Sequence, residues 1–209
     1  MASSPSDNRA AGQGATSGVG ATSGRAWVDL AAFDNSDYRP GRSSLVCTAW
    51  YFCSLLFLET GWFPVSQLKV WLLRQFGARV GHGVVIKPHV RIKYPWRLTV
   101  GDHCWIGQEA WIDNIADVTI GNHVCISQLV YLCTGSHDHR TKTFDLITKP
   151  IVVHDGAWLG ARCTILPGVT IGANALVAGG SVATKNVEPA AIVAGAPATP
   201  IGSRTEPTA

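Results

Sequence analysis

Aliphatic residues recur at every sixth position over the last third of the chain. Val153, Leu159, Ile165, Ile171 and Val177 follow one another at this spacing, with Gly directly after the second and the fourth. A period of six is too short for a repeat built from helices and is typical of a β-helix in which each hexapeptide forms one side of a coil. The pattern therefore predicts an all-β solenoid with the leading aliphatic residue of each hexapeptide pointing inward.

The same spacing can be followed back towards the middle of the chain. The earlier leading residues form three runs: Val80, Ile86 and Ile92; Val100, Ile106 and Ile112; and Ile120, Ile126 and Leu132. Two steps of eight between these runs indicate small corner insertions. Three hexapeptides make one coil, and roughly five to six coils fit into residues 80–197. We expect a parallel β-helix over 80–197, with strands about 4.8 Å apart, and a C-terminal tail at 198–209.

Two apolar segments precede the first coil. Residues 45–58 are mostly apolar and aromatic, and residues 65–76 carry Leu68, Trp71 and Phe76 at helical spacing. The first segment is too short to span a bilayer. We expect residues 25–79 to be helical, with two interpretations open: a cap over the open end of the β-helix, or a membrane-apposed segment whose aromatic helix lies among lipid headgroups.

Composition narrows the class of protein. Residues 1–24 are mainly Ala, Ser, Gly and Thr, which predicts a disordered tail without a signal peptide. A formal net charge of +3 over 209 residues is too small for the basic surface of a nucleic-acid-binding protein. The six cysteines show no C-x-x-C spacing and mostly occupy apolar positions of the hexapeptides, which predicts reduced thiols in a cytosolic protein.

One long break interrupts the six-residue spacing, between Leu132 and Val153. A β-helix tolerates insertions at its corners, and long loops in compact domains are usually functional. The inserted loop, residues 133–152, holds His137 next to Asp138. An imidazole with a pKa of about 6.5 can take a proton from a hydroxyl at neutral pH. We therefore expect this loop to be catalytic.

Three segments, together with the hexapeptides, carry a resemblance to a known family: 77–81 (GARVG), 92–102 (IKYPWRLTVGD) and 131–139 (YLCTGSHDH). Over residues 40–203 the chain resembles the hexapeptide-repeat acyltransferases, and more narrowly the colanic acid biosynthesis acetyltransferases. The resemblance implies left-handed coils and an acetyl-CoA-dependent O-acetyltransferase. It also implies a homotrimer with an active site at each subunit boundary and a carbohydrate acceptor.

The resemblance also assigns roles to individual residues. His137 matches the general base that takes the proton of a sugar hydroxyl as it attacks the acetyl thioester. The backbone N–H of Ala161, after Gly160, matches the donor that stabilises the resulting oxyanion. Trp158 lies where related enzymes place an indole against the reacting end of acetyl-CoA, and the alternative for it is a stacking residue on an outer face.

Further cofactor contacts are expected towards the C-terminus. The pantetheine arm of acetyl-CoA is expected along Gly179 and Gly180, and Thr184 and Lys185 are candidate contacts, although Lys185 also fits a solvated corner lysine. Related enzymes carry a basic residue soon after the position of Pro197, where this chain has Ala, Thr and Pro. Arg204 is the candidate replacement.

The acceptor site is less well specified. Gln108 matches the position of a sugar-binding Asn, and Asp113 and Asn114 are candidates for holding sugar hydroxyls, with shaping of their own turn as the alternative. Asp138 either orients His137 or caps its own loop. A lipid-linked acceptor would fit a membrane-apposed N-terminal segment at the inner face of the membrane.

Two other classes of function stay open at this point. A zinc enzyme on the same fold needs converging histidines, and His82, His89, His103 and His123 show no repeated ligand pair, so we expect no metal. A non-catalytic scaffold leaves the histidine of the inserted loop without a role.

Overall fold

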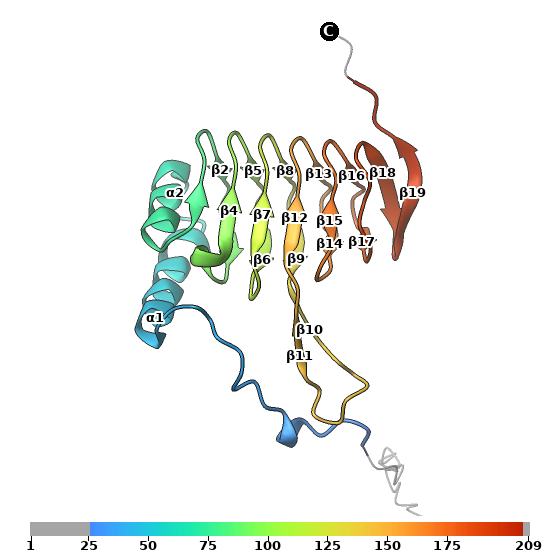
Figure 1. The fold of residues 1–209 in the computed structure, drawn as a ribbon. Coiled ribbons are helices and arrows are strands. Elements are labelled where there is room, and N and C mark those ends of the chain that lie inside the picture. The colour runs from blue at the N-terminus through green and yellow to red at the C-terminus, as the bar shows by residue number, and fades with distance from the viewer. Residues whose placement is uncertain (1–25, 207–209) are drawn as a thin grey trace, which may run out of the picture.

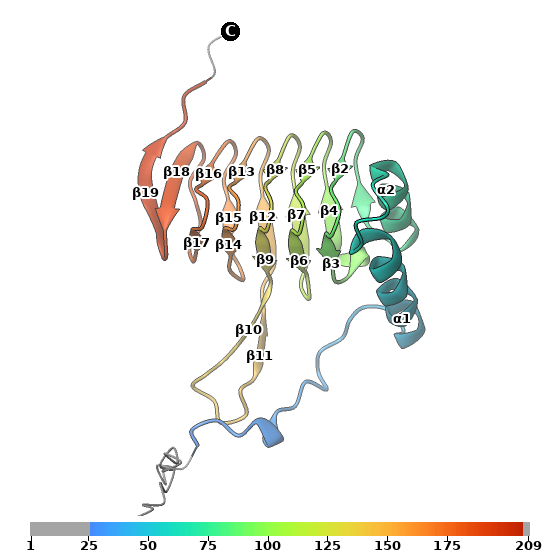
Figure 2. The same cartoon turned by 180° about the vertical axis from the view of Figure 1, so that it is seen from behind.

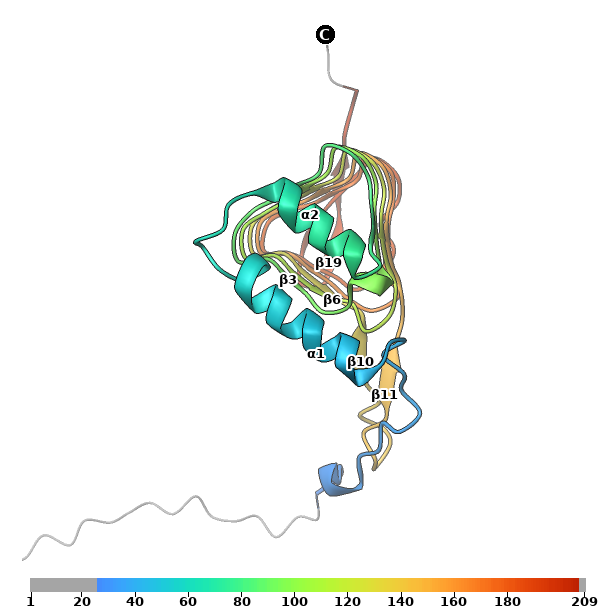
Figure 3. The same ribbon diagram turned by 90° about the vertical axis from the view of Figure 1, so that its left-hand side faces the viewer.

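The structure is a computed structural model that describes residues 26–206. A parallel β-helix of about six left-handed turns forms its body (Figure 1 and Figure 2). Viewed along its axis the β-helix is triangular, with one sheet on each side (Figure 3). We name these sheets A, B and C in the order in which the chain enters them.

Each sheet stacks one short strand from every coil in parallel register. Sheet A contains β1 (Arg79–Val80), β4 (Leu98–Val100), β7 (Val118–Ile120), β12 (Ile151–Val153) and β15 (Thr170–Ile171). Sheet B contains β2 (Val85–Ile86), β5 (Trp105–Ile106), β8 (Cys125–Ile126), β13 (Trp158–Leu159), β16 (Leu176–Val177), β18 (Ala191–Gly195) and β19 (Ala198–Ser203). Sheet C contains β3 (Arg91–Ile92), β6 (Trp111–Asp113), β9 (Tyr131–Cys133), β14 (Thr164–Ile165) and β17 (Val182–Ala183).

The predicted column of aliphatic residues is confirmed as the core. Every leading residue from Val80 to Val177 is buried, and most are less than 3% exposed. Cys104 and Cys163 are buried in the same core, and burial raises the pKa of the Cys163 thiol to about 12. All six cysteines are unpaired, in agreement with the expected free thiols.

Two helices close the N-terminal end of the β-helix (Figure 3). They lie within the segment 25–79 that we expect to be helical, but residues 26–43 are largely irregular. The chain forms α1 (Ser44–Cys53), which continues into a π-helical turn, η2 (Ser54–Leu58), and then α2 (Ser66–Gln75). No helix in residues 26–206 is long and apolar enough to cross a membrane.

Side chains of this helical cap satisfy backbone groups that the first coil cannot pair with a preceding coil. At sheet A, Arg74 donates to the carbonyls of Val80 and Gly81. At sheet B, the Ser66 hydroxyl donates to the Ile86 carbonyl and accepts from the Ile86 N–H, and Lys69 donates to the carbonyl of Lys87. At sheet C, Trp50 donates to the carbonyl of Ile92. Unpaired buried backbone groups are costly. These contacts support the capping interpretation of the segment.

The C-terminal end differs from the expected tail. Residues 198–203 form β19, which runs antiparallel to β18 and covers the last coil. β19 pairs with the backbone N–H and carbonyl groups of β18 that would otherwise form an exposed edge of sheet B. The predicted N-terminal tail, residues 1–24, and the last three residues of the predicted C-terminal tail, 207–209, lie outside the described residues.

The inserted loop, residues 133–152, contains two strands. It leaves the β-helix at the corner between sheets C and A as an antiparallel hairpin of β10 (Gly135–His137) and β11 (Leu146–Thr148). Residues 26–43, which we call the N-terminal strap, include the 3₁₀ turn η1 (Leu30–Ala32) and run beside this hairpin before entering α1 (Figure 1).

Candidate functional site

His137 lies at the end of β10, and its ring is held from two sides. Its Nδ1 lies 2.8 Å from the carbonyl oxygen of Phe144, and its ring stacks on the Phe144 ring with centroids 4.3 Å apart. Because a carbonyl oxygen only accepts hydrogen bonds, Nδ1 carries the proton and Nε2 keeps its lone pair. The hairpin therefore fixes the His137 ring and leaves Nε2 as its hydrogen-bond acceptor.

The N-terminal strap forms one wall of a cavity beside His137. This His137 cavity has a volume of about 510 Å³, and Phe33 and Tyr38 of the strap line it together with Lys93 and Tyr94. The Phe33 ring meets the His137 ring edge-on, with centroids 5.4 Å apart. This contact could not be predicted from the sequence, because a few aromatic residues in an irregular segment give no periodic signal.

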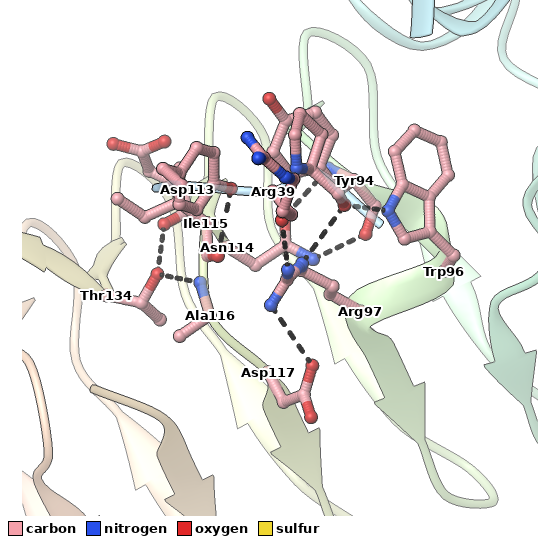
Figure 4. A network of polar contacts seen from close by, with 12 residues as sticks. Arg39, Tyr94, Trp96, Arg97, Asp113, Asn114, Ile115, Ala116, Asp117 and Thr134 are labelled. Carbon is pink, nitrogen blue, oxygen red and sulfur yellow. Dashed lines mark hydrogen bonds and ion pairs between the residues drawn. The ribbon is translucent and has the colours of Figure 1, made fainter. Parts of the chain in front are cut away.

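Trp96 and Arg97 clamp the strap in place (Figure 4). The indole N–H of Trp96 donates to the carbonyl of Pro40 at 2.6 Å, and the guanidinium of Arg97 donates to the carbonyl of Arg39 at 2.7 Å. Both residues belong to one of the segments that carry the family resemblance. In this chain, the segment 92–102 holds the strap against the corner between sheets C and A through these two side chains.

Asp138 caps its own loop. Its two carboxylate oxygens accept from Nε and Nη2 of Arg140, each at 2.8 Å, and one of them also accepts from the Arg140 backbone N–H. These hydrogen bonds hold the pKa of Asp138 below its ordinary value. Since the Phe144 carbonyl, and not Asp138, contacts His137 Nδ1, these hydrogen bonds support the loop-capping interpretation. A contact of Asp138 with the acceptor stays a prediction.

Asp113 and Asn114 have different environments. Asn114 is fully buried, and its side-chain amide bonds both the N–H and the carbonyl of Tyr94. Asn114 therefore shapes this corner, which corrects its expected role in holding sugar hydroxyls. Asp113 accepts from the Tyr131 hydroxyl at 3.2 Å and lies 3.3 Å from the Lys93 ammonium. The atom nearest Lys93 is its buried Oδ1, which makes an ion pair there but no hydrogen bond within the described residues.

The expected oxyanion donor lies at the corner between sheets B and C. Ala161 is exposed, and its backbone N–H has no acceptor within residues 26–206. A Cβ on the preceding Gly160 would lie 2.6 Å from the backbone N of Gly179 in the next coil. Gly160 is therefore needed for coil packing. Trp158 is 45% exposed, and its indole donates to Ser127.

Gly180 has a positive φ of 71°, and a Cβ at this position would have no neighbouring atom within 4 Å. The corresponding corner positions of the other coils carry larger residues at φ of about 60°: His89, Glu109, Leu129 and Arg162. The backbone conformation alone therefore does not require glycine here. The absence of a side chain leaves the surface beside Gly179 open to the close approach of a ligand.

The remaining cofactor candidates lie at other corners. Thr184 and Lys185 line a cavity of about 500 Å³ next to β18 and β19. Arg204 instead donates to the carbonyls of Gly156 and Asn174, both at 3.1 Å. These carbonyls lie at the corner between sheets A and B, so a single chain does not bring Arg204 and Lys185 together.

The candidate residues are thus distributed over separate corners of the triangle. The hairpin with His137 leaves the corner between sheets C and A, whereas Ala161, Gly179 and Gln108 lie at the corner between sheets B and C. Gln108 is exposed, two coils below Ala161, and contacts Glu109. One chain therefore does not bring the expected general base and the expected oxyanion donor together. Within residues 26–206 no three His, Cys, Asp or Glu side chains gather as metal ligands would.

Comparison with known proteins shows which sequences and structures this chain resembles. The family model described as bacterial transferase hexapeptide (six repeats) matches residues 150–185. A protein of Escherichia coli that carries the name of a colanic acid biosynthesis acetyltransferase, WcaF, is 38% identical over 181 residues, which are 85% of this chain and 98% of that protein. The galactoside O-acetyltransferase of E. coli is 32% identical over 60% of this chain and 64% of its own length.

Solved structures agree with this comparison. A hexapeptide-repeat acetyltransferase of Vibrio cholerae in complex with acetyl-CoA has a TM-score of 0.71 and 29% identity, over 79% of this chain and 92% of that one. A galactoside acetyltransferase in complex with coenzyme A has a TM-score of 0.61 and 26% identity, over 66% and 70%.

Proposed function

We propose that this chain, which belongs to the hexapeptide-repeat acetyltransferases, is an O-acetyltransferase acting on a carbohydrate hydroxyl with His137 as its general base. That it is an acetyltransferase using acetyl-CoA follows from its family. The observation that carries the finer proposal is the hydrogen bond from His137 Nδ1 to the Phe144 carbonyl, beside a cavity. A carbohydrate acceptor is supported by the names of the galactoside and colanic acid relatives.

The reaction follows from these groups. His137 Nε2 takes the proton of the acceptor hydroxyl while the hydroxyl oxygen attacks the thioester carbonyl carbon. The tetrahedral intermediate carries an oxyanion, for which the Ala161 N–H is the proposed donor. Collapse breaks the C–S bond, the imidazolium returns its proton to the thiolate, and the products are the acetyl ester and coenzyme A.

A homotrimer would join the two halves of the site. The outward row of sheet B is apolar along its whole length: Val85, Trp105, Cys125, Trp158, Leu176 and Ile192. Trp105 is 61% exposed in the single chain. Such a row suits a subunit interface. Placing it near the hairpin of a second subunit would bring His137 of one chain to Ala161, Gly179 and Gly180 of the next.

The proposed acceptor class is tested by thiol release from acetyl-CoA with a panel of oligosaccharides. We expect release to depend on a saccharide and to be accompanied by an acetyl ester that mild alkali removes. Release with amino sugars only, yielding an alkali-stable amide, would contradict O-transfer. Stoichiometric zinc in the purified protein would favour the metal-dependent alternative.

The proposed subunit boundary makes a separate prediction for mixed trimers. If each site combines His137 of one chain with Ala161 of the next, trimers reassembled from His137→Ala and Ala161→Pro chains regain intact sites. In a one-to-one mixture, a boundary is intact only when the chain that supplies His137 is the Ala161→Pro variant and the chain that supplies Ala161 is the His137→Ala variant. Each condition holds with a probability of one half, so we expect about one quarter of wild-type activity. Each variant unfolded and refolded alone is the control. Mixtures no more active than either variant would place the whole site within one chain.

We further propose that the enzyme works in the cytoplasm, at the inner face of the membrane. The free thiols suit a reducing compartment. The helical cap, which carries four of the eight exposed aromatic residues of the described chain, is the surface available for a peripheral contact.

A further inference from the structure

The N-terminal strap supplies much of the wall of the His137 cavity. Of the nine residues that line this cavity, four belong to the strap: Phe33, Asn35, Tyr38 and Pro40. The others come from the β-helix and the hairpin: Lys93, Tyr94, Ile115, His137 and Leu146. The cavity volume of about 510 Å³ lies within the range of small-molecule sites. The strap is therefore part of this cavity and not only a connection to α1.

The strap is tied on both sides of Phe33. Before Phe33, the backbone N–H of Asp29 donates to the carbonyl of Lys142, in the loop between β10 and β11, at 2.8 Å. After Phe33, Trp96 and Arg97 bind strap carbonyls at 2.6 and 2.7 Å (Figure 4). These contacts span from the hairpin to the corner of the β-helix. They hold the Phe33 ring in place beside His137.

The imidazole of His137 lies between two aromatic rings. Phe144 stacks on it with centroids 4.3 Å apart, and Phe33 meets it edge-on at 5.4 Å. Neither phenyl ring offers a hydrogen bond, whereas an ordered water in a protein makes about three. A saccharide is large enough to reach polar groups on other walls of the cavity, such as Asn35 and Lys93. The arrangement therefore disfavours a lone water beside the imidazole more than it disfavours a saccharide.

A general base does not by itself distinguish a saccharide hydroxyl from water. In hydrolysis, His137 would take one proton of a water whose oxygen attacks the thioester carbonyl carbon. The C–S bond would then break, the imidazolium would return its proton to the thiolate, and the products would be acetic acid and coenzyme A. We infer that the strap, through Phe33, keeps water from His137 and so gives the site its preference for a saccharide hydroxyl. The inference rests on the proposed function, because it concerns what the same base activates.

The partition between transfer and hydrolysis tests this inference. Acetyl ester and free thiol are measured in the same reaction, and thiol release is also measured without an acceptor. Phe33→Ala should raise acceptor-independent thiol release about tenfold, because water regains about one hydrogen bond where the ring lay. The ester formed per thiol released should fall. Phe33→Leu, which keeps an apolar side chain at this position, should stay close to the wild type.

Leu30→Ala is the matched control. Leu30 is another apolar residue of the strap, but it is 68% exposed and does not line the His137 cavity. Its replacement should leave both the acceptor-independent rate and the ester yield unchanged. The Tm of each variant shows whether the β-helix is intact.

Trp96→Phe tests the same wall without changing the lining of the cavity, because Trp96 does not line it. A phenyl ring can still stack on Tyr94 but lacks the N–H that binds the Pro40 carbonyl. We expect acceptor-independent release to rise here too, though less than in Phe33→Ala, because Arg97 still holds the strap.

Several results would overturn the inference. One is a wild-type partition in a normally folded Phe33→Ala protein. Another is an equal rise in Leu30→Ala, which would mean that any change in the strap admits water. A rise in Trp96→Phe without one in Phe33→Ala would assign the exclusion of water to another strap residue.

The proposed function fails by different results. Wild-type transfer and hydrolysis in His137→Ala would contradict the proposed base. If no saccharide is acetylated but Phe33→Ala still raises acceptor-independent release, the proposed acceptor class fails and the role of Phe33 stands.

Discussion

Replacement of His137 by alanine is expected to lower kcat/KM for acetyl transfer by about a hundred- to ten-thousand-fold, the usual contribution of a general base. The side chain is the proposed acceptor of the hydroxyl proton, and its Nδ1 is already engaged with the Phe144 carbonyl. Without the imidazole the hydroxyl must attack while still protonated. The measurement is thiol release from acetyl-CoA over a range of saccharide acceptor concentrations.

His139→Ala is the matched control for this loss. His139 lies two residues away in the same hairpin and is exposed, so its removal should leave the rate close to that of the wild type. Circular dichroism and the Tm of both variants would show whether the β-helix is intact. A His137→Ala protein that folds normally and turns over at the wild-type rate would remove this residue from the chemistry.

The fold could be predicted from the sequence because its determinant is local. A residue such as Ile126 is buried between the residues at the equivalent position of the two neighbouring coils. One repeating sequence position therefore forms the whole core. β19 could not be predicted in this way, because Ala198–Ser203 lies outside the repeat and pairs with β18 where the chain turns back.

The site was only partly predictable, for a related reason. His137 stood out because it interrupts the repeat, but the strap that covers it could not be recognised. Its contacts join residues far apart in sequence, such as Phe33 with His137 and Pro40 with Trp96. Asn114 was expected to contact the acceptor because it is polar and lies beside the site. Its side-chain amide instead makes its hydrogen bonds with the backbone N–H and carbonyl of Tyr94.

Replacement of Ala161 by proline should lower kcat by about a hundred- to a thousand-fold, the range found when one oxyanion-hole donor is removed. Proline deletes only the backbone N–H and keeps the carbonyl. That N–H has no acceptor within the described chain, whereas the carbonyl accepts from Gly180 N–H at 2.8 Å. Pro88 occupies the corresponding corner of the first coil, so the fold accommodates proline at this position. The KM for acetyl-CoA should change much less than kcat, because the oxyanion exists only after attack.

Gln128→Pro provides the control, since Gln128 occupies the same corner one coil below Ala161 and its N–H likewise has no acceptor in residues 26–206. If proline at this corner merely strained the coil, both variants would lose stability and activity together. A selective loss of kcat in Ala161→Pro, with equal Tm values for the two variants, assigns the loss to the missing donor. Wild-type kcat in Ala161→Pro would instead require the oxyanion donor to be another group, and the exposed surface beside Gly179 would be the next place to look for it.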